Sequence, residues 1–187
     1  MKLTRLSIVV LILISMISCG TFEKATTLNT RTNYFPAKKN KIPSILIDIP
    51  TNPDTLKMML VVPSTDYWLA MGKYMNYFDK VLTYDQFENE IVKKGLSDKI
   101  TSLSDKVGLN RAYNYFQPFV ILEMTKINKP GGGWFAGLAL YDPKKADVIF
   151  QNEIRLNLMW DGWTDQGTMF PLFNSMLDYL RKQKINK

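Results

Sequence analysis

Apolar side chains gather in six stretches of the chain whose patterns predict β-strands. The runs 57–62 and 119–124 are apolar at almost every position, as expected for strands buried inside a sheet. The stretch from Val148 to Trp160 instead alternates apolar and polar residues, a period of two that indicates a sheet with one covered and one wetter face. The predicted strands are 44–49, 57–62, 80–82, 119–124, 134–141 and 148–160.

Between these strands and after the last one, apolar residues recur at the spacing of amphipathic helices. Such stripes occupy 68–78, 87–92, 109–116 and 173–180. The second helix has the clearest ends, because 83–86 fits a Ser/Thr-x-x-Glu/Gln capping box and Gly95 can end the helix in a left-handed conformation. Tyr67, Tyr74 and Tyr77 lie off the first stripe, where exposed aromatic side chains would mark a protein-binding patch.

This order of elements predicts the fold class. It favours a single α/β (α+β) domain with a mixed β-sheet, in the order β-α-β-α-α-β-β-β-α, and with the helices packed on the sheet. Turn residues at 128–133 and 142–145 separate the last three strands, so we expect a hairpin or meander there.

Four stretches of this pattern resemble a known group of bacterial envelope domains. They are KMMLVVPS, YDQFENEIVKKGL, LNRAYNYFQPFVILEMTK and GLALYDPKKADVIFQNEI, and the resemblance spans about 57–158. The group includes the amino-terminal domain of TolB, the curli-secretion lipoprotein CsgG and the penicillin-binding-protein activator LpoB. The resemblance implies a docking or assembly part without catalytic residues, and no site residue is carried over from it. A curli-type pore is disfavoured, because no additional pair of long strands with a lipid-facing apolar side is evident.

The first 18 residues predict a secretory signal peptide. Lys2 and Arg5 precede an unbroken apolar run over 8–14 that is too short to cross a bilayer. The residues around Cys19 resemble a bacterial lipobox, with Met16 where the pattern usually has leucine. We therefore predict that Cys19 is lipidated; the alternative is an ordinary cleaved signal followed by an unmodified cysteine.

The remaining chain divides into two predicted parts. Residues 19–42 are polar and show neither helical nor strand periodicity, which indicates a lipidated cysteine followed by a flexible tether. Residues 43–187 are predicted to form the globular domain, which is large enough to bury a sizeable core.

Composition removes several function classes. The chain has no histidine and one cysteine, which excludes Ser-His-Asp and Cys-His catalysis, histidine metal ligands and paired-cysteine chemistry. Its formal charge of +7 falls to +5 once Lys2 and Arg5 are removed with the signal. A basic protein often binds nucleic acid, but an exported one rarely meets it, so we predict no nucleic-acid partner. No cofactor is predicted.

Two tryptophans beside acidic residues form the most unusual stretch. Trp160, Asp161, Trp163 and Asp165, together with Trp134, are the candidate binding residues, because aromatic rings stack on sugars while carboxylates accept hydrogen bonds from their hydroxyls. The competing interpretation is a loop whose tryptophans cover the edge of the core. A calcium site at Asp161 and Asp165 is a weaker hypothesis, because their spacing is not that of an EF-hand loop.

The sequence thus favours a non-catalytic, membrane-anchored envelope lipoprotein that binds another envelope protein or helps to assemble a complex. The alternative is a peptidoglycan- or glycan-binding lipoprotein that uses its tryptophans. Gly20 after the lipidated cysteine resembles the sorting pattern for the outer membrane, so we expect the domain to face the periplasm from that membrane rather than from the inner one.

Overall fold

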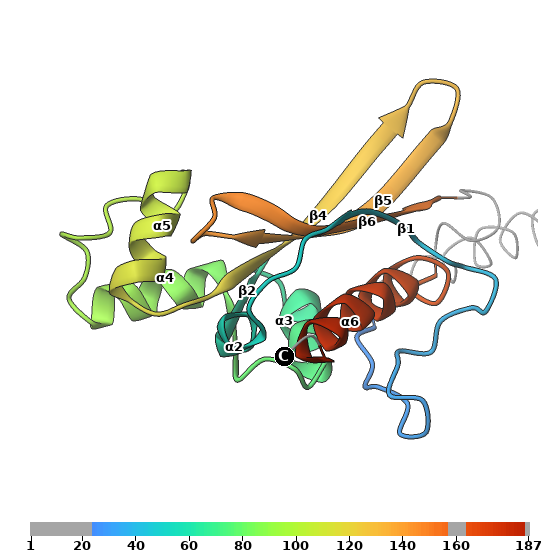
Figure 1. The fold of residues 1–187 in the computed structure, drawn as a ribbon, viewed down its shortest axis with the longest axis horizontal. Coiled ribbons are helices and arrows are strands. Elements are labelled where there is room, and N and C mark those ends of the chain that lie inside the picture. Colours follow the sequence, from blue (N-terminus) through green and yellow to red (C-terminus); the bar gives the residue numbers. More distant parts are fainter. Residues whose placement is uncertain (1–23, 157–163, 186–187) are drawn as a thin grey trace, which may run out of the picture.

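The computed structural model describes residues 24–156 and 164–185, which fold around one six-stranded mixed sheet (Figure 1). The strands are β1 (Ser44–Asp48), β2 (Met59–Val62), β3 (Lys80–Thr83), β4 (Val120–Lys129), β5 (Gly133–Asp142) and β6 (Asp147–Arg155). The helices are α2 (Pro53–Met58), α3 (Asp66–Tyr74), α4 (Tyr84–Lys93), α5 (Lys106–Tyr115) and α6 (Met169–Ile185). From β2 to α6 the order of elements is the one predicted from the sequence, and the α/β class is confirmed.

The sheet has a parallel and an antiparallel part. Its strand order is β1-β6-β5-β4-β2-β3. Strand β2 pairs in parallel with β3 and β4, whereas β4, β5, β6 and β1 pair antiparallel, each with the next. The predicted meander at the end of the chain therefore forms, and the run 44–49 supplies the edge strand β1.

Helices cover the sheet on both faces, and strands β2 to β6 contribute side chains to both of the resulting cores. Leu60 and Val62 pack with α3 and α6, whereas Met59 and Val61 pack with α4 and α5. Successive side chains of a strand point to opposite faces. This explains why the sequence of β2 is apolar at every position.

The start of α4 confirms the predicted capping box. The Thr83 hydroxyl accepts the Gln86 N–H at 3.2 Å, and the Gln86 side chain accepts the Thr83 N–H at 3.1 Å. These reciprocal bonds satisfy two backbone groups that would otherwise have no partner at the helix end. Gly95 adopts a φ of 66° just after the helix, as expected.

Residues 53–58 form a helix where the sequence predicts a turn followed by the start of a strand. The side chain of Asn52 accepts the Asp54 N–H at 3.0 Å, and Pro53 occupies the first turn, where its missing N–H costs nothing. Leu56 is fully buried in the core formed with α6. The predicted strand 57–62 is therefore shortened to β2, which begins at Met59.

The prediction of a flexible tether over 19–42 is wrong for the part that the structure describes. Phe35 is only 2% exposed and packs against the rings of Phe170 and Phe173 in α6. The Asn174 side chain accepts the Phe35 N–H at 2.8 Å and donates to the Phe35 carbonyl at 2.9 Å. The segment 24–42 therefore belongs to the domain, whereas the predicted signal peptide and Cys19 lie outside the described residues.

Within the described residues, no helix combines the length and the apolar character needed to span a bilayer.

Candidate binding surface

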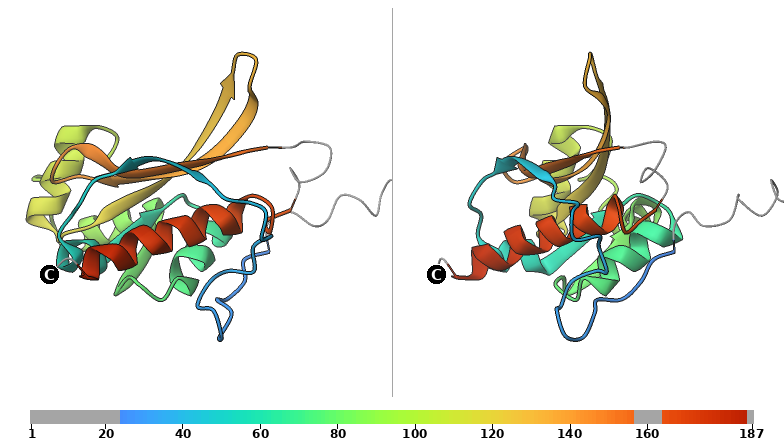
Figure 2. Two further views of the ribbon diagram at one scale, coloured as in Figure 1. Left: turned by 45° about the vertical axis from the view of Figure 1, so that its right-hand side comes forward. Right: turned by 90° about the vertical axis from the view of Figure 1, so that its right-hand side faces the viewer.

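The β4–β5 hairpin projects from the body of the domain (Figures 1 and 2). Its strands pair continuously from Ile121 opposite Tyr141 to Lys129 opposite Gly133. Gly131 and Gly133 have φ values of 70° and 86°, which glycine adopts without strain at such a turn. The turn predicted at 128–133 therefore exists. Strand β4, however, continues to Lys129 rather than ending at Met124.

Large apolar side chains are exposed on this hairpin. Met124, Ile127 and Trp134 are 47%, 38% and 41% exposed. Because side chains alternate along a strand, Met124, Lys126 and Trp134 point to the face that α3 and α6 cover nearer the core. The Lys126 ammonium lies 5.8 Å from the centre of the Trp134 ring. We call these three residues the hairpin patch.

The opposite face of the hairpin combines apolar and charged side chains. Ile127 lies opposite Phe135, and the Lys129 ammonium is 4.3 Å from the centre of the Phe135 ring. Lys129 also forms an ion pair with Glu153, whose side chain is buried. On this face the charge of Lys129 is therefore offset by Glu153.

A cavity of about 250 Å³ opens at the base of the hairpin patch. Met124 and Lys126 of the patch form one wall, and Tyr67, Trp68, Leu156 and Asp165 contribute to the rest. The Tyr67 hydroxyl donates to the Asp165 carboxylate at 3.4 Å. The cavity is mainly apolar, with one carboxylate and one ammonium at its edge.

Two of the predicted binding residues lie at this surface. Asp165 lines the cavity, and the Trp134 carbonyl accepts a hydrogen bond at 2.8 Å from the N–H of Leu156, which lines the same cavity. Trp160, Asp161 and Trp163 lie outside the described residues, so the predicted aromatic loop is not placed. Sequence reasoning missed Met124, Lys126 and Ile127 as surface residues because it ended the strand at Met124.

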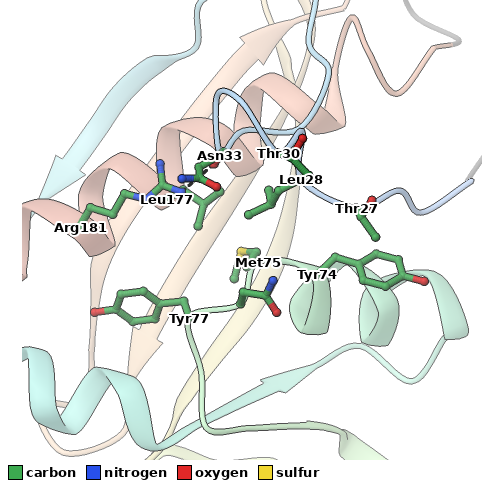
Figure 3. Close-up of a pocket in the computed structure, with 10 residues that line it drawn as sticks. Thr27, Leu28, Thr30, Asn33, Tyr74, Met75, Tyr77, Leu177 and Arg181 are labelled. Atoms are coloured by element: carbon green, nitrogen blue, oxygen red, sulfur yellow. Dashed lines mark hydrogen bonds between the residues drawn. The ribbon is translucent and has the colours of Figure 1, made fainter.

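A second cavity, of about 520 Å³, separates the N-terminal segment from α3 and α6 (Figure 3). Arg181 donates to the Asn33 carbonyl at 2.6 Å, and its guanidinium lies 4.8 Å from the centre of the Tyr34 ring. Tyr34 in turn donates to the Asp178 carboxylate. The polar groups at this edge thus pair with one another and hold the segment in place.

The tyrosines beside the first predicted helical stripe do not form an exposed patch. Tyr67 and Tyr77 are buried, and Tyr77 donates to the Leu180 carbonyl at 3.2 Å. Burial, together with the nearby Asp54, raises the pKa of Tyr77. The rings of Tyr74 and Tyr77 extend away from each other at the second cavity (Figure 3).

Known proteins include no detectable relative of this chain. No family model, curated protein or solved structure matches this chain significantly. The resemblance to envelope domains therefore remains a sequence-based expectation.

Proposed function

We propose that the protein is a non-catalytic, membrane-anchored lipoprotein of the bacterial envelope that binds another envelope protein through its β4–β5 hairpin. The observation that carries this proposal is the exposure of Met124 and Trp134 on a hairpin that projects from the domain. Protein interfaces are enriched in aromatic residues and methionine at their centres. A projecting hairpin presents such residues to a partner without rearrangement of the core.

Charge indicates the chemistry of the partner surface. Lys126 lies beside the Trp134 ring, and the chain carries a formal charge of +5 once Lys2 and Arg5 are removed with the predicted signal. A complementary partner presents acidic groups around an apolar centre, which would guide its approach and fix the orientation of the complex.

The predicted anchor would place this hairpin near a membrane. Because Phe35 is held on α6, the chain between Cys19 and Phe35 can span at most about 55 Å, even if fully extended at ~3.5 Å per residue. A partner within this distance of the bilayer surface is a membrane protein or another envelope protein.

Substituting the lipidated cysteine tests the anchor. We expect Cys19→Ser to abolish incorporation of labelled palmitate and to move the protein from the membrane to the soluble fraction, because acyl chains contribute about 0.8 kcal/mol per buried methylene. Fractionation and palmitate labelling of the wild-type and variant chains measure this. Unchanged labelling and membrane association of the variant would contradict the lipoprotein proposal.

Trp134→Ala tests the docking surface. We expect this variant to weaken binding of the partner by about 2 kcal/mol, or thirtyfold in Kd, because a tryptophan at the centre of an interface is often an energetic hot spot. The matched control is Tyr115→Ala, which removes an aromatic side chain that is 55% exposed on α5. The measurement is quantitative co-isolation after cross-linking; a partner lost equally from both variants, or from neither, would argue against the hairpin.

Glycan binding is the second candidate. Asp165 lines the cavity beneath the hairpin, and Trp134 is exposed next to it, an arrangement that suits a sugar ring stacked on the indole. Co-sedimentation with purified peptidoglycan sacculi distinguishes the two candidates. Sedimentation that requires Trp134 supports the glycan candidate, and sedimentation that persists in Trp134→Ala removes it.

A further inference from the structure

The hairpin patch presents an indole ring and an ammonium group side by side. Of the two described tryptophans, Trp68 is buried, whereas Trp134 is 41% exposed. The Lys126 ammonium lies 5.8 Å from the centre of the Trp134 ring and forms no ion pair with a carboxylate among the described residues. Trp134 pairs with Asn128, which is two residues nearer to the turn than Lys126. The Lys126 side chain therefore extends toward the turn, and its charge accompanies the indole.

The cavity at the base of the hairpin patch has the complementary chemistry. Its wall is mainly apolar and includes sulfur atoms and aromatic rings, contributed by Met124, Met169, Tyr67 and Trp68. Methionine sulfur and aromatic rings both make favourable contacts with an aromatic side chain. Asp165 lies on the same wall and is partly exposed. Its carboxylate can accept an indole N–H and can attract an ammonium group.

Trp134 lies beside this cavity without lining it. Its carbonyl accepts the N–H of Leu156, which is a wall residue, but the indole is not part of the wall. Met124 on the wall and Asn128, which pairs with Trp134, are four residues apart along β4, or about 14 Å at ~3.4 Å per residue. The exposed indole and the opening of the cavity are thus displaced from each other along one face of the hairpin.

We propose that the partner of the hairpin patch is a second copy of this chain, and that Trp134 of each copy enters the cavity of the other. This inference rests on the proposed function, because it uses the same surface. A twofold axis that passes between the indole and the cavity packs two hairpins face to face and antiparallel, with each indole over the opposite cavity. Such an isologous contact uses the same patch on both copies and closes at a dimer.

Charge complementarity favours a second copy as the occupant. With Trp134 in the opposite cavity, the Lys126 ammonium beside it lies at the edge of that cavity, which carries Asp165 of the second copy. The twofold arrangement forms two such pairs, one at each end of the contact, and keeps the two Lys126 ammonium groups apart. The proposed function requires a partner with acidic groups around an apolar centre, and the cavity of this chain is such a surface.

The predicted anchor makes a weak contact sufficient. Copies that are confined to one bilayer surface meet at a higher effective concentration than free copies do. We therefore expect only moderate affinity once the full chain is extracted into mild detergent, with a dimer Kd of about 10 μM.

Sedimentation equilibrium of the full chain in detergent measures this association. We expect a reversible equilibrium between monomer and dimer. Trp134→Ala should raise the Kd at least about thirtyfold, because each dimer would lose two docked indoles. Tyr115→Ala is the matched control, since it removes an exposed aromatic side chain from α5 and should leave the Kd unchanged.

Charge reversal tests whether the pairs form between copies. Lys126→Glu and Asp165→Lys each place like charges at both ends of a homodimer, so we expect each variant alone to associate at least about tenfold more weakly. In an equimolar mixture, a heterodimer joins the two reversed charges at one end and keeps the native pair at the other. We expect the mixture to associate about as tightly as the wild-type chain. Lys93→Glu, at an exposed position of α4, is the control and should not change the Kd.

Rescue by mixing supports the proposal, because a contact within one chain cannot produce it, and it also shows that both variants are folded. A wild-type chain that stays monomeric at about ten times the expected Kd would overturn the proposal. A mixture no tighter than its two components, or association that continues beyond the dimer, would overturn it as well.

Cross-linking separates this failure from a failure of the proposed function. If the wild-type chain is monomeric but a different envelope protein is co-isolated only when Trp134 is present, the second copy is the wrong occupant and the docking surface stands. If neither a second copy nor another protein depends on Trp134, both proposals fail.

Discussion

Phe35→Ala is expected to lower the free energy of unfolding by about 3–5 kcal/mol and to release the N-terminal segment from the domain. The Phe35 ring is almost completely buried, and its centre lies 5.8 Å from those of Phe170 and Phe173. Alanine would leave a cavity in this cluster and remove both aromatic contacts. The two hydrogen bonds from the Phe35 backbone to Asn174 would then have to hold the segment without the packing that positions it.

Urea unfolding measures the loss of stability, and limited proteolysis reports release of the segment. Tyr115→Ala serves as the control, because it removes an aromatic ring that is mostly exposed. We expect a change of less than about 1 kcal/mol for this control and no new cleavage between residues 24 and 42. If Phe35→Ala behaved like the control, the segment would be the flexible tether that its sequence pattern suggests.

The failure to predict this attachment has a physical cause. Periodicity detects faces that repeat along an element, whereas the N-terminal segment is held by the buried Phe35, a few scattered apolar side chains and several polar contacts. Its partners Asn174, Asp178 and Arg181 lie on one helix about 140 residues later in the chain. No local pattern encodes a contact over that distance.

The helix α2 was missed for a different reason. Helix α2 directly precedes the buried strand β2, so the apolar residues of the two elements form one continuous run in the sequence. Asn52 followed by Pro53 is nevertheless an N-cap signal that the sequence contains. By contrast, α4 was predicted with its capping box, because Thr83, Gln86 and Gly95 are local signals that no tertiary contact overrides.

For the candidate sites, the sequence predicts which residues have suitable chemistry better than it predicts which residues lie next to one another. Trp134 and Asp165 are predicted from their chemistry, and the structure places Trp134 near the turn of the projecting hairpin and Asp165 on the wall of the cavity at the base of the hairpin patch. The cavity of about 330 Å³ between the N-terminal end of α5 and the sheet could not be predicted in this way. Its wall combines residues from α5, β4, β5 and β6, which come together only when the four elements are packed in the folded domain.

Gly137 is a further position whose role depends on packing, and Gly137→Ala is expected to destabilise the protein by about 3 kcal/mol or more. A Cβ atom there would overlap the backbone oxygen of Asn152 on β6 and would lie 2.5 Å from the Thr125 hydroxyl on β4. The Asn152 backbone cannot move away freely. Its buried side chain accepts the Leu138 N–H at 3.0 Å and donates to the Leu172 carbonyl of α6 at 2.9 Å, so a shift would break both bonds.

Chemical denaturation of three variants separates the two overlaps. Gly132→Ala at the hairpin tip is the control. A Cβ atom there would come no closer than 3.3 Å to another atom, the Cβ of Lys129, so we expect a change of less than about 1 kcal/mol. Adding Thr125→Ala to Gly137→Ala removes the contact with the hydroxyl but leaves the one with the backbone oxygen. Only a minor part of the stability should therefore return. Full recovery in the double variant would show that the hydroxyl alone excludes a side chain from position 137, and that the junction between β5, β6 and α6 at Asn152 tolerates displacement.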